Sequence, residues 1–258
     1  NLIHFKFAAM TIDEANRRLI SSLGTIYDER EASSIASLVM EKITGEPRGL
    51  RVLHKQERLS GEQESLFRKW LGELMQNRPV QYVLGEAWFM GLRFYVNEQV
   101  LIPRPETEEL VDWVLKDLET GLGRDFSILD IGTGSGCIPV SIGNKRPGLR
   151  LLACDISRSA LEIAKKNSID HNVNVEFIHC DILDDSTWSA IPAVHLLISN
   201  PPYIPEWQKA QLDKHVRDFE PETALFVPDN DPVIFYKQIG LLAKKKLLSG
   251  GKVFLESH

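Results

Sequence analysis

Residues 200–203 read Asn-Pro-Pro-Tyr and directly follow an apolar run that ends in a serine. Proline has no N–H group and a fixed φ, so Pro201 and Pro202 offer rigid carbonyl acceptors. Asn200 adds a side-chain oxygen, and Tyr203 adds a flat aromatic face. Such a corner suits a planar group with an –NH2, because its two hydrogens need two acceptors. These four residues are therefore candidates for catalysis and for substrate binding.

A nitrogen of this kind is a poor nucleophile, because its lone pair is delocalised. Two acceptors that hold its hydrogens localise the pair and aim it at an electrophile, and prearranged dipoles contribute strongly to such catalysis. Adenine N6, cytosine N4, guanine N2 and a glutamine amide all fit, and the tetrapeptide does not choose among them. Taken alone, it is equally compatible with a structural turn.

A glycine-rich loop, Asp-Ile-Gly-Thr-Gly-Ser-Gly, is the second candidate site. Glycines allow a tight turn and a close approach of the backbone to a ligand. The spacing fails the G-x-G-x-x-G pattern of dinucleotide sites, whether it is counted from Gly132 or from Gly134. The candidate cofactor-binding residues of the loop are Asp130, Gly132, Thr133, Gly134, Ser135 and Gly136.

Three acidic residues, Asp130, Asp155 and Asp181, stand where successive strands are expected to end. Ligands of open α/β sheets bind at the carboxyl ends of strands, where Asp155 can accept from ribose hydroxyls and Asp181 can meet an adenine amino group. Each aspartate alone could be a helix cap. Three carboxylates suit a cationic cofactor better than a pyrophosphate. The whole pattern therefore indicates S-adenosylmethionine and resembles the class I methyltransferases.

The elements around these residues alternate between strand and helix. Strands are expected at 127–132, 150–156, 175–181, 195–200 and 252–256, and helices at 157–168 and 232–248, with a further helix from about Thr107. This alternation predicts an α/β fold with a mostly parallel sheet and helices on both faces.

The N-terminal part predicts helices instead. Thr11 and Ser60 each open a capping-box sequence followed by apolar residues at helical spacing, and Pro79 is expected to end the last helix. An aromatic-rich stretch follows, with Gly91 expected in the turn of a β-hairpin. We expect a helical domain at 1–79, a linking hairpin at 80–102 and a methyltransferase domain at 103–258.

Composition excludes several classes of protein. The chain has 258 residues, 43% of them hydrophobic, and no apolar run approaches the roughly 20 residues that span a bilayer. The net charge is −6 with no basic tail, which disfavours a protein that grips nucleic acid through phosphates. The three cysteines form no CxxC pair, and no His or Cys spacing supports a metal site. The start shows no signal or transit peptide, which favours the cytoplasm of a bacterium.

Four stretches together resemble the peptide chain release factor glutamine methyltransferases of the HemK/PrmC type. They are RPVQYVLGEAWFMGLRFYVNEQVLIPRPETEELV, DIGTGSGCI, SNPPYIP and RDFEPETALFV. The resemblance implies a class I methyltransferase domain, Rossmann-like, behind a small helical substrate-docking domain. It also implies N5-methylation of the glutamine in the Gly-Gly-Gln loop of class I release factors, with S-adenosyl-L-methionine as cofactor and S-adenosyl-L-homocysteine as product.

The resemblance also implies roles for single residues. The family's cofactor loop corresponds to 132–136, and its ribose-binding carboxylate corresponds to Asp155. The residues at the adenine edge correspond to Asp181 and Ile182, and those near the methionine end of the cofactor to Arg104 and Glu106. The corner beside cofactor and substrate corresponds to Asn200, Pro201, Pro202 and Tyr203. Asn200 and the Pro201 carbonyl would accept from the glutamine amide.

Two alternatives remain open. An N6-adenine or other amino-methyltransferase of DNA or RNA would use the same corner, but it would need a basic channel and a flipped base. A binding module that kept the cofactor fold without catalysis is disfavoured by the intact Asn200 and glycine loop. The family's sheet continues past the fifth expected strand, so its C-terminal strands are expected to be missing from this chain.

Overall fold

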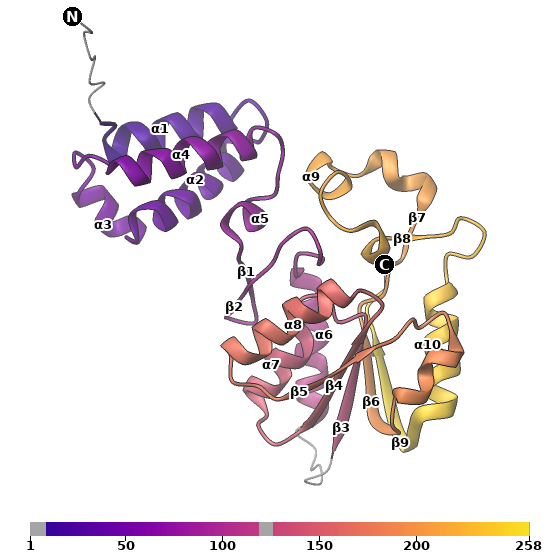
Figure 1. Cartoon of the computed structure of the whole chain (residues 1–258). Coiled ribbons are helices and arrows are strands. Elements are labelled where there is room, and N and C mark those ends of the chain that lie inside the picture. Colours follow the sequence, from indigo (N-terminus) through magenta and orange to yellow (C-terminus); the bar gives the residue numbers. More distant parts are fainter. Residues whose placement is uncertain (1–8, 119–125, 258) are drawn as a thin grey trace, which may run out of the picture. The chain divides into compact units, whose positions relative to one another are not determined.

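The computed structural model describes residues 9–118 and 126–257. The chain divides into two compact units, Asn1–Leu84 and Gly85–His258, which are described separately below (Figure 1).

The first unit is helical. Its elements are α1 (Ile12–Leu23), α2 (Glu29–Thr44), α3 (Arg48–Leu53), α4 (Gly61–Leu74) and α5 (Val80–Leu84). Both expected capping boxes form, since Thr11 and Ser60 each exchange hydrogen bonds with the residue three positions later. Apolar faces of α1, α2 and α4 enclose a core around Leu19, Met40 and Phe67.

The boundary between the units differs from the expected one. α4 ends at Leu74, ahead of Pro79, and the short helix α5 follows. Val80 and Val83 of α5 are buried in the same core as α2 and α4, which is why these residues belong to the helical unit. The hairpin is correspondingly shorter, with β1 (Ala87–Phe89) and β2 (Leu92–Phe94) paired antiparallel around a turn at Met90 and Gly91.

The second unit is built on a five-stranded parallel sheet. Its strands are β3 (Ser127–Ile131), β4 (Arg150–Asp155), β5 (Val175–His179), β6 (Val194–Ser199) and β9 (Leu247–Leu255), in the order β5-β4-β3-β6-β9. The expected alternation of strand and helix is confirmed. Several strand bounds differ by one residue, and two differences are larger: β5 ends at His179, so Asp181 lies in the loop beyond it, and β9 begins earlier, at Leu247.

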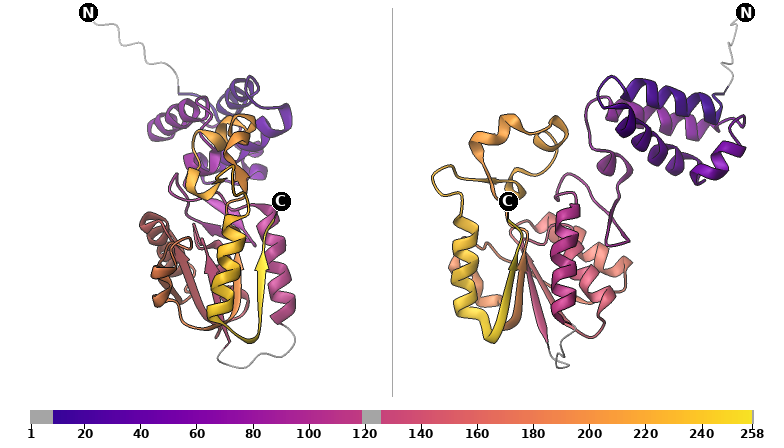
Figure 2. Two further views of the ribbon diagram at one scale, coloured as in Figure 1. Left: turned by 90° about the vertical axis from the view of Figure 1, so that its right-hand side faces the viewer. Right: turned by 180° about the vertical axis from the view of Figure 1, so that it is seen from behind.

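Helices cover both faces of this sheet. α6 (Pro105–Asp117), α7 (Cys137–Lys145) and α8 (Arg158–Asp170) lie on one face, and α10 (Ile234–Lys246) lies on the other (Figure 2). Neighbouring strand residues alternate between the two cores: Ile128 packs with α6 and α7, whereas Leu129 packs with α10. The expected α/β fold is therefore confirmed.

A segment of little regular structure follows β6. It contains β7 (Ile204–Pro205), α9 (Lys214–Arg217) and β8 (Phe226–Val227), with 3-10 turns at Asp185–Ala190 before β6 and at Glu206–Gln211 and Glu222–Ala224 within the segment. β7 and β8 pair in parallel, which ties the two ends of the segment together.

The strand order decides where a ligand can bind. From β3 the chain moves to β4 and β5 on one side, and then returns to place β6 on the other side of β3. Such a reversal opens a crevice at the carboxyl ends of the two diverging strands. The residues that follow β3 and β6 are the glycine loop and Asn200. In the described part of the chain, no helix combines the length and the apolar character needed to cross a bilayer.

Candidate active site

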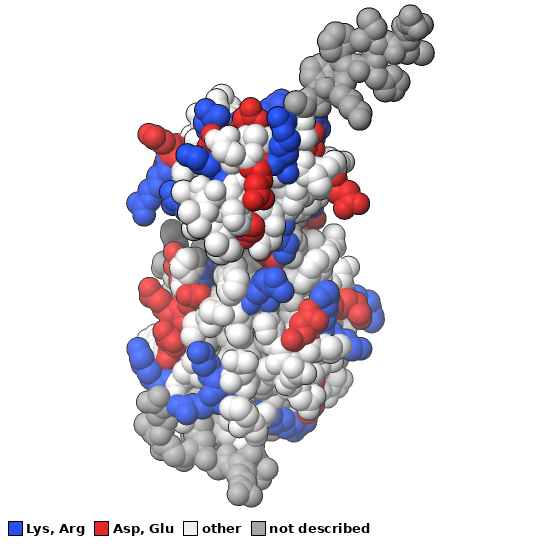
Figure 3. Space-filling view, turned by 90° about the vertical axis from the view of Figure 1, so that its left-hand side faces the viewer, with Lys and Arg blue, Asp and Glu red and all other residues white. Residues whose placement is uncertain are grey.

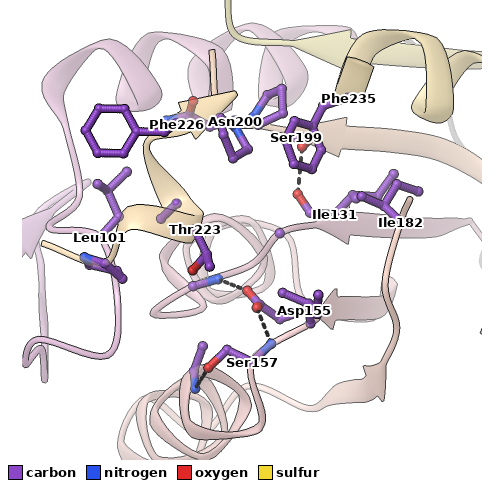
Figure 4. A pocket seen from close by; sticks show the side chains of 18 of the residues that line it. Leu101, Ile131, Asp155, Ser157, Ile182, Ser199, Asn200, Thr223, Phe226 and Phe235 are labelled. Atoms are coloured by element: carbon purple, nitrogen blue, oxygen red, sulfur yellow. Dashed lines mark hydrogen bonds between the residues drawn. The ribbon is translucent and has the colours of Figure 1, made fainter. Parts of the chain in front are cut away.

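A cavity of about 750 Å³ lies at the carboxyl edge of the sheet. Its walls come from the glycine loop after β3, the end of β4, the loop after β5, the corner after β6 and the segment 221–228. Figure 4 shows side chains from these elements around one space. The strand reversal thus brings the two sequence motifs to a common cavity.

The glycine loop is held against β4. The backbone N–H groups of Gly132 and Thr133 both donate to the Cys154 carbonyl oxygen, at 2.9 and 3.0 Å. Gly132 and Gly134 line the cavity, whereas Gly136 faces α8. A Cβ on Gly136 would lie 3.0 Å from the Ala164 Cβ, so this third glycine allows the loop to pack against the helix.

Asp155 anchors the loop from the end of β4. Its Oδ2 accepts from the Gly134 N–H at 2.9 Å, and its Oδ1 accepts from the Ser157 N–H at 2.8 Å (Figure 4). Burial raises the pKa of Asp155, and these backbone N–H groups oppose the shift. Each carboxylate oxygen retains acceptor capacity on the cavity side, because it has more than one lone pair.

Asp130 lies in β3, just before the loop, and does not border the cavity. Its side chain is fully buried, and within the described residues neither oxygen has a hydrogen-bond partner. Burial raises the pKa of Asp130 to about 7. The nearby Thr133 hydroxyl opposes this shift, and the negative charge of Asp155 adds to it. The hydroxyls of Thr133 and Ser135 are buried and unpartnered among the same residues.

The loop after β5 supplies an apolar wall. Asp181, Ile182 and Leu183 border the cavity, together with Ile156 after β4 and Phe235 of α10. The Asp181 Oδ1 accepts from the Leu183 N–H at 2.8 Å, which leaves its second oxygen without a bond in this turn. This wall has the composition that a flat ring with one polar edge requires.

The corner after β6 also faces the cavity. Asn200, Pro201 and Pro202 border it, and all their peptide bonds are trans. The Asn200 Nδ2 donates to the Thr107 Oγ1 at 3.0 Å. Tyr203 is half-buried outside the cavity lining, and burial is the first cause that raises its pKa.

Arg104 and Glu106 flank this corner without bordering the cavity. Both lie close enough to Tyr203 to influence its pKa. The Arg104 guanidinium pairs with the Glu220 carboxylate at 2.5 Å, and the same carboxylate accepts from the Ile102 N–H at 3.2 Å. The Glu220 side chain has no exposed surface, so this ion pair fixes the start of the segment that forms one cavity wall.

Sequence reasoning missed the wall at 221–228. Its Thr223 and Phe226 side chains border the cavity (Figure 4). The stretch RDFEPETALFV contributed to the resemblance, but no site residue was drawn from it. No local pattern in this stretch predicts that it borders a cavity, because its position depends on the pairing of β7 with β8.

The cavity is acidic. Its charged lining residues are Asp155, Asp181, Glu206, Glu222 and Lys209, and the lysine is paired with Glu222 at 2.5 Å. On the surface shown in Figure 3, by contrast, both signs of charge are interspersed. No group of His, Cys, Asp and Glu residues suited to a metal ion occurs among the residues that the structure describes.

A parallel α/β sheet with a glycine loop, a carboxylate at the second strand end and an Asn-Pro-Pro corner defines a methyltransferase. Comparison with known families agrees: residues 111–216 match the methyltransferase small domain, and residues 14–85 match the PrmC N-terminal domain.

The curated relatives identify the particular family. A release factor glutamine methyltransferase of Flavobacterium psychrophilum is 39% identical over 248 residues, covering 96% of this chain and 86% of that protein. Proteins of the same name from Chlorobaculum tepidum and Bacteroides thetaiotaomicron are 39% and 37% identical over 86% and 91% of this chain, and the matches cover 77% and 83% of their own lengths. The chain belongs to the release factor glutamine methyltransferase family.

Proposed function

We propose that this chain transfers a methyl group from S-adenosylmethionine to the N5 side-chain nitrogen of the glutamine in the Gly-Gly-Gln loop of class I peptide chain release factors. The observation that carries the proposal is the shared cavity. Asn200 and Pro201 form one part of its wall, and the glycine loop with Asp155 forms another. A donor and an acceptor of the methyl group can therefore meet in one cavity.

The residues present fit this cofactor. A Cβ built on Gly134 meets no atom within 4 Å, so the loop leaves open space directly above its backbone. Asp155 retains acceptors for ribose hydroxyls, and Asp181 and Ile182 offer a polar and an apolar contact to adenine. When bound, S-adenosylmethionine supplies an electrophilic methyl group on a positively charged sulfur. The acidic lining of the cavity favours that charge.

The remaining loop residues have supporting roles in this proposal. Gly132, Gly134 and Gly136 set the path of the loop, the buried side chains of Thr133 and Ser135 anchor it, and Asp130 adds a buried carboxyl group just before it. Tyr203, Arg104 and Glu106 stand at the outer side of the corner, where we propose that they contact the release factor segment around the glutamine.

The corner contributes to catalysis by positioning the substrate amide. The Asn200 Oδ1 and the Pro201 carbonyl accept the two amide hydrogens of the substrate glutamine, which localises the nitrogen lone pair and directs it into the cavity. Fixed acceptors need no reorganisation when positive charge develops on that nitrogen. The proton then leaves after methyl transfer, so no strong base is needed at the corner.

The partner and the location follow from the same proposal. A class I release factor is the protein substrate, and the helical unit, which matches the PrmC N-terminal domain, is proposed to dock it. The proposed place of action is the bacterial cytoplasm, where translation terminates.

Radiolabelled methyl transfer tests the function. The chain is incubated with labelled S-adenosylmethionine and a class I release factor, its Gly-Gly-Gln→Gly-Gly-Ala variant, DNA or RNA. Label in the intact factor alone is the expected result, and label in nucleic acid instead would overturn the assignment. In the same assay, Asn200→Ala should lower kcat by about 100-fold or more, as loss of a fixed transition-state dipole does, while the Kd of the cofactor changes less than about threefold.

A further inference from the structure

Three elements meet beside Asn200. Asn200 follows β6, Glu256 follows β9, and Thr107 lies in the first turn of α6. The register Ser199↔Leu255 makes the two strand ends neighbours, and the Glu256 N–H donates to the Ser199 carbonyl oxygen at 3.0 Å. The pairing of β6 with β9 thus fixes the Glu256 backbone beside the catalytic corner.

The side chains form a chain of hydrogen bonds. The Thr107 Oγ1 lies 2.7 Å from the Glu256 Oε2 and 3.0 Å from the Asn200 Nδ2. Thr107 is only 3% exposed, so water cannot readily replace either contact. The Tyr236 hydroxyl donates to the Glu256 carbonyl oxygen at 3.1 Å and holds the glutamate backbone from α10.

The direction of this chain follows from the donor inventory. An ionised carboxylate only accepts, so the single Thr107 proton is donated to Glu256. The Thr107 oxygen then has lone pairs left for Asn200, and only the Nδ2 branch of that amide can donate to them. The Oδ1 branch has no partner among the described residues, and Asn200 borders the cavity.

The hydrogen-bond donor beside Glu256 agrees with this direction, whereas burial and the charge of Glu106 act against the ionised form. Burial raises the pKa of Glu256, and the hydrogen bond from Thr107 lowers it, as a donor to the ionised form does; the nearby Asn200 amide lowers it further. Arg104 lowers the pKa of the same carboxyl group, and Glu106 raises it. Arg104 is thus the cationic neighbour of Glu256, and Glu106 is its anionic neighbour.

We propose that Thr107 and Glu256 are positioning residues that fix the Asn200 amide with its oxygen towards the cavity, where it accepts from the substrate –NH2. The proposal rests on the proposed function and adds to it the reason why an asparagine presents one face of its amide. Without the pair, an amide turned by 180° would present Nδ2, a donor, to a substrate group that also donates. Such an orientation repels the substrate nitrogen instead of aligning it.

The test compares isosteric variants at Thr107 at pH 8, with saturating release factor and cofactor. Thr107→Val keeps the shape and removes the hydroxyl, and Thr107→Ser keeps the hydroxyl. Thr107→Val should lower kcat by about 10- to 100-fold, the effect of one buried hydrogen bond to a catalytic group, with the KM for S-adenosylmethionine within about threefold. Thr107→Ser should recover kcat to within about fivefold of the wild type.

Two further variants separate positioning from folding. Glu256→Gln offers both a donor and an acceptor to Thr107, so both orientations of Asn200 become possible and kcat should fall by about 3- to 30-fold. Ser141→Ala removes another buried hydroxyl, in α7 away from the cavity lining, and should leave kcat unchanged. Each variant is checked for its thermal transition before it is assayed.

The outcomes are distinct. Wild-type chain that fails to methylate the factor contradicts the proposed function. Active wild-type chain with an unaffected Thr107→Val, or a loss that Thr107→Ser does not recover, overturns the positioning role. If Thr107→Val does not fold, the same decision rests on Glu256→Gln, for which unchanged kcat overturns the proposal.

Discussion

Gly136 offers the sharpest test of how the loop is built. Both Gly134 and Gly136 have positive φ, 53° and 77°. A Cβ on Gly134 meets nothing within 4 Å, whereas one on Gly136 would lie 3.0 Å from the Ala164 Cβ and 3.1 Å from the Ala164 Cα. The two Gly→Ala changes therefore share the backbone strain, and only Gly136→Ala adds a collision with α8.

The magnitudes separate the two effects. A left-handed conformation costs alanine about 1–2 kcal/mol, and the lost freedom of the unfolded chain returns about 0.4–1 kcal/mol. Gly134→Ala should therefore lower the free energy of unfolding by at most about 1.6 kcal/mol. Overpacking adds about 1–3 kcal/mol to this effect, so Gly136→Ala should lower the free energy of unfolding by about 1–4.6 kcal/mol.

Urea unfolding followed by tryptophan fluorescence measures both values. Of the five tryptophans, Trp70 lies in the helical unit, so a Trp70→Phe background leaves the signal to the second unit, where Trp188 is buried. Ala164→Gly removes the nearer contact, and a double-mutant cycle with Gly136→Ala should show a favourable coupling of about 1 kcal/mol. Equal losses for Gly134→Ala and Gly136→Ala, with no coupling to residue 164, would refute the packing argument.

Two further predictions concern buried charge. Because burial raises the pKa of Asp130 to about 7, the folded chain binds a proton that the unfolded chain has released, so the free energy of unfolding should fall as pH rises from about 4 to 7 and level off above 7. Asp130→Asn should flatten that slope in urea titrations at pH 5 and pH 8, and an unchanged slope contradicts the assignment. Arg104→Met leaves the Glu220 carboxylate buried without its cation, so the segment 221–228 should loosen, which raises the KM for S-adenosylmethionine and speeds tryptic cleavage after Arg217. Adding Glu220→Gln should recover part of both effects, and a single variant indistinguishable from the wild type in both assays argues against this role.

Local sequence patterns were sufficient to predict most of the fold. Capping boxes at Thr11 and Ser60, the turn at Gly91 and the alternation of strand and helix each depend on residues close together in sequence, so they were predictable. The predicted bounds were wrong where contacts between residues remote in sequence determine an element. α5 is helical and belongs to the first unit because its apolar residues complete that unit's core, and β9 begins at Leu247 because it pairs with β6.

The residues along the chain are enough to predict the available chemistry: a glycine loop with few side chains, carboxylates at or just beyond strand ends, and rigid acceptors at 200–202. Residue type and backbone restriction suffice for that, since they are local properties. Which of these groups share a cavity depends on the fold, which places Asp155 and Asn200 in the cavity wall and buries Asp130 outside it. The fold alone brought Thr107, Asn200 and Glu256 together, because the parallel pairing of β6 with β9 and the docking of α6 join residues that are remote along the chain. Hydrogen-bond direction is set by such neighbours, and no local pattern records it.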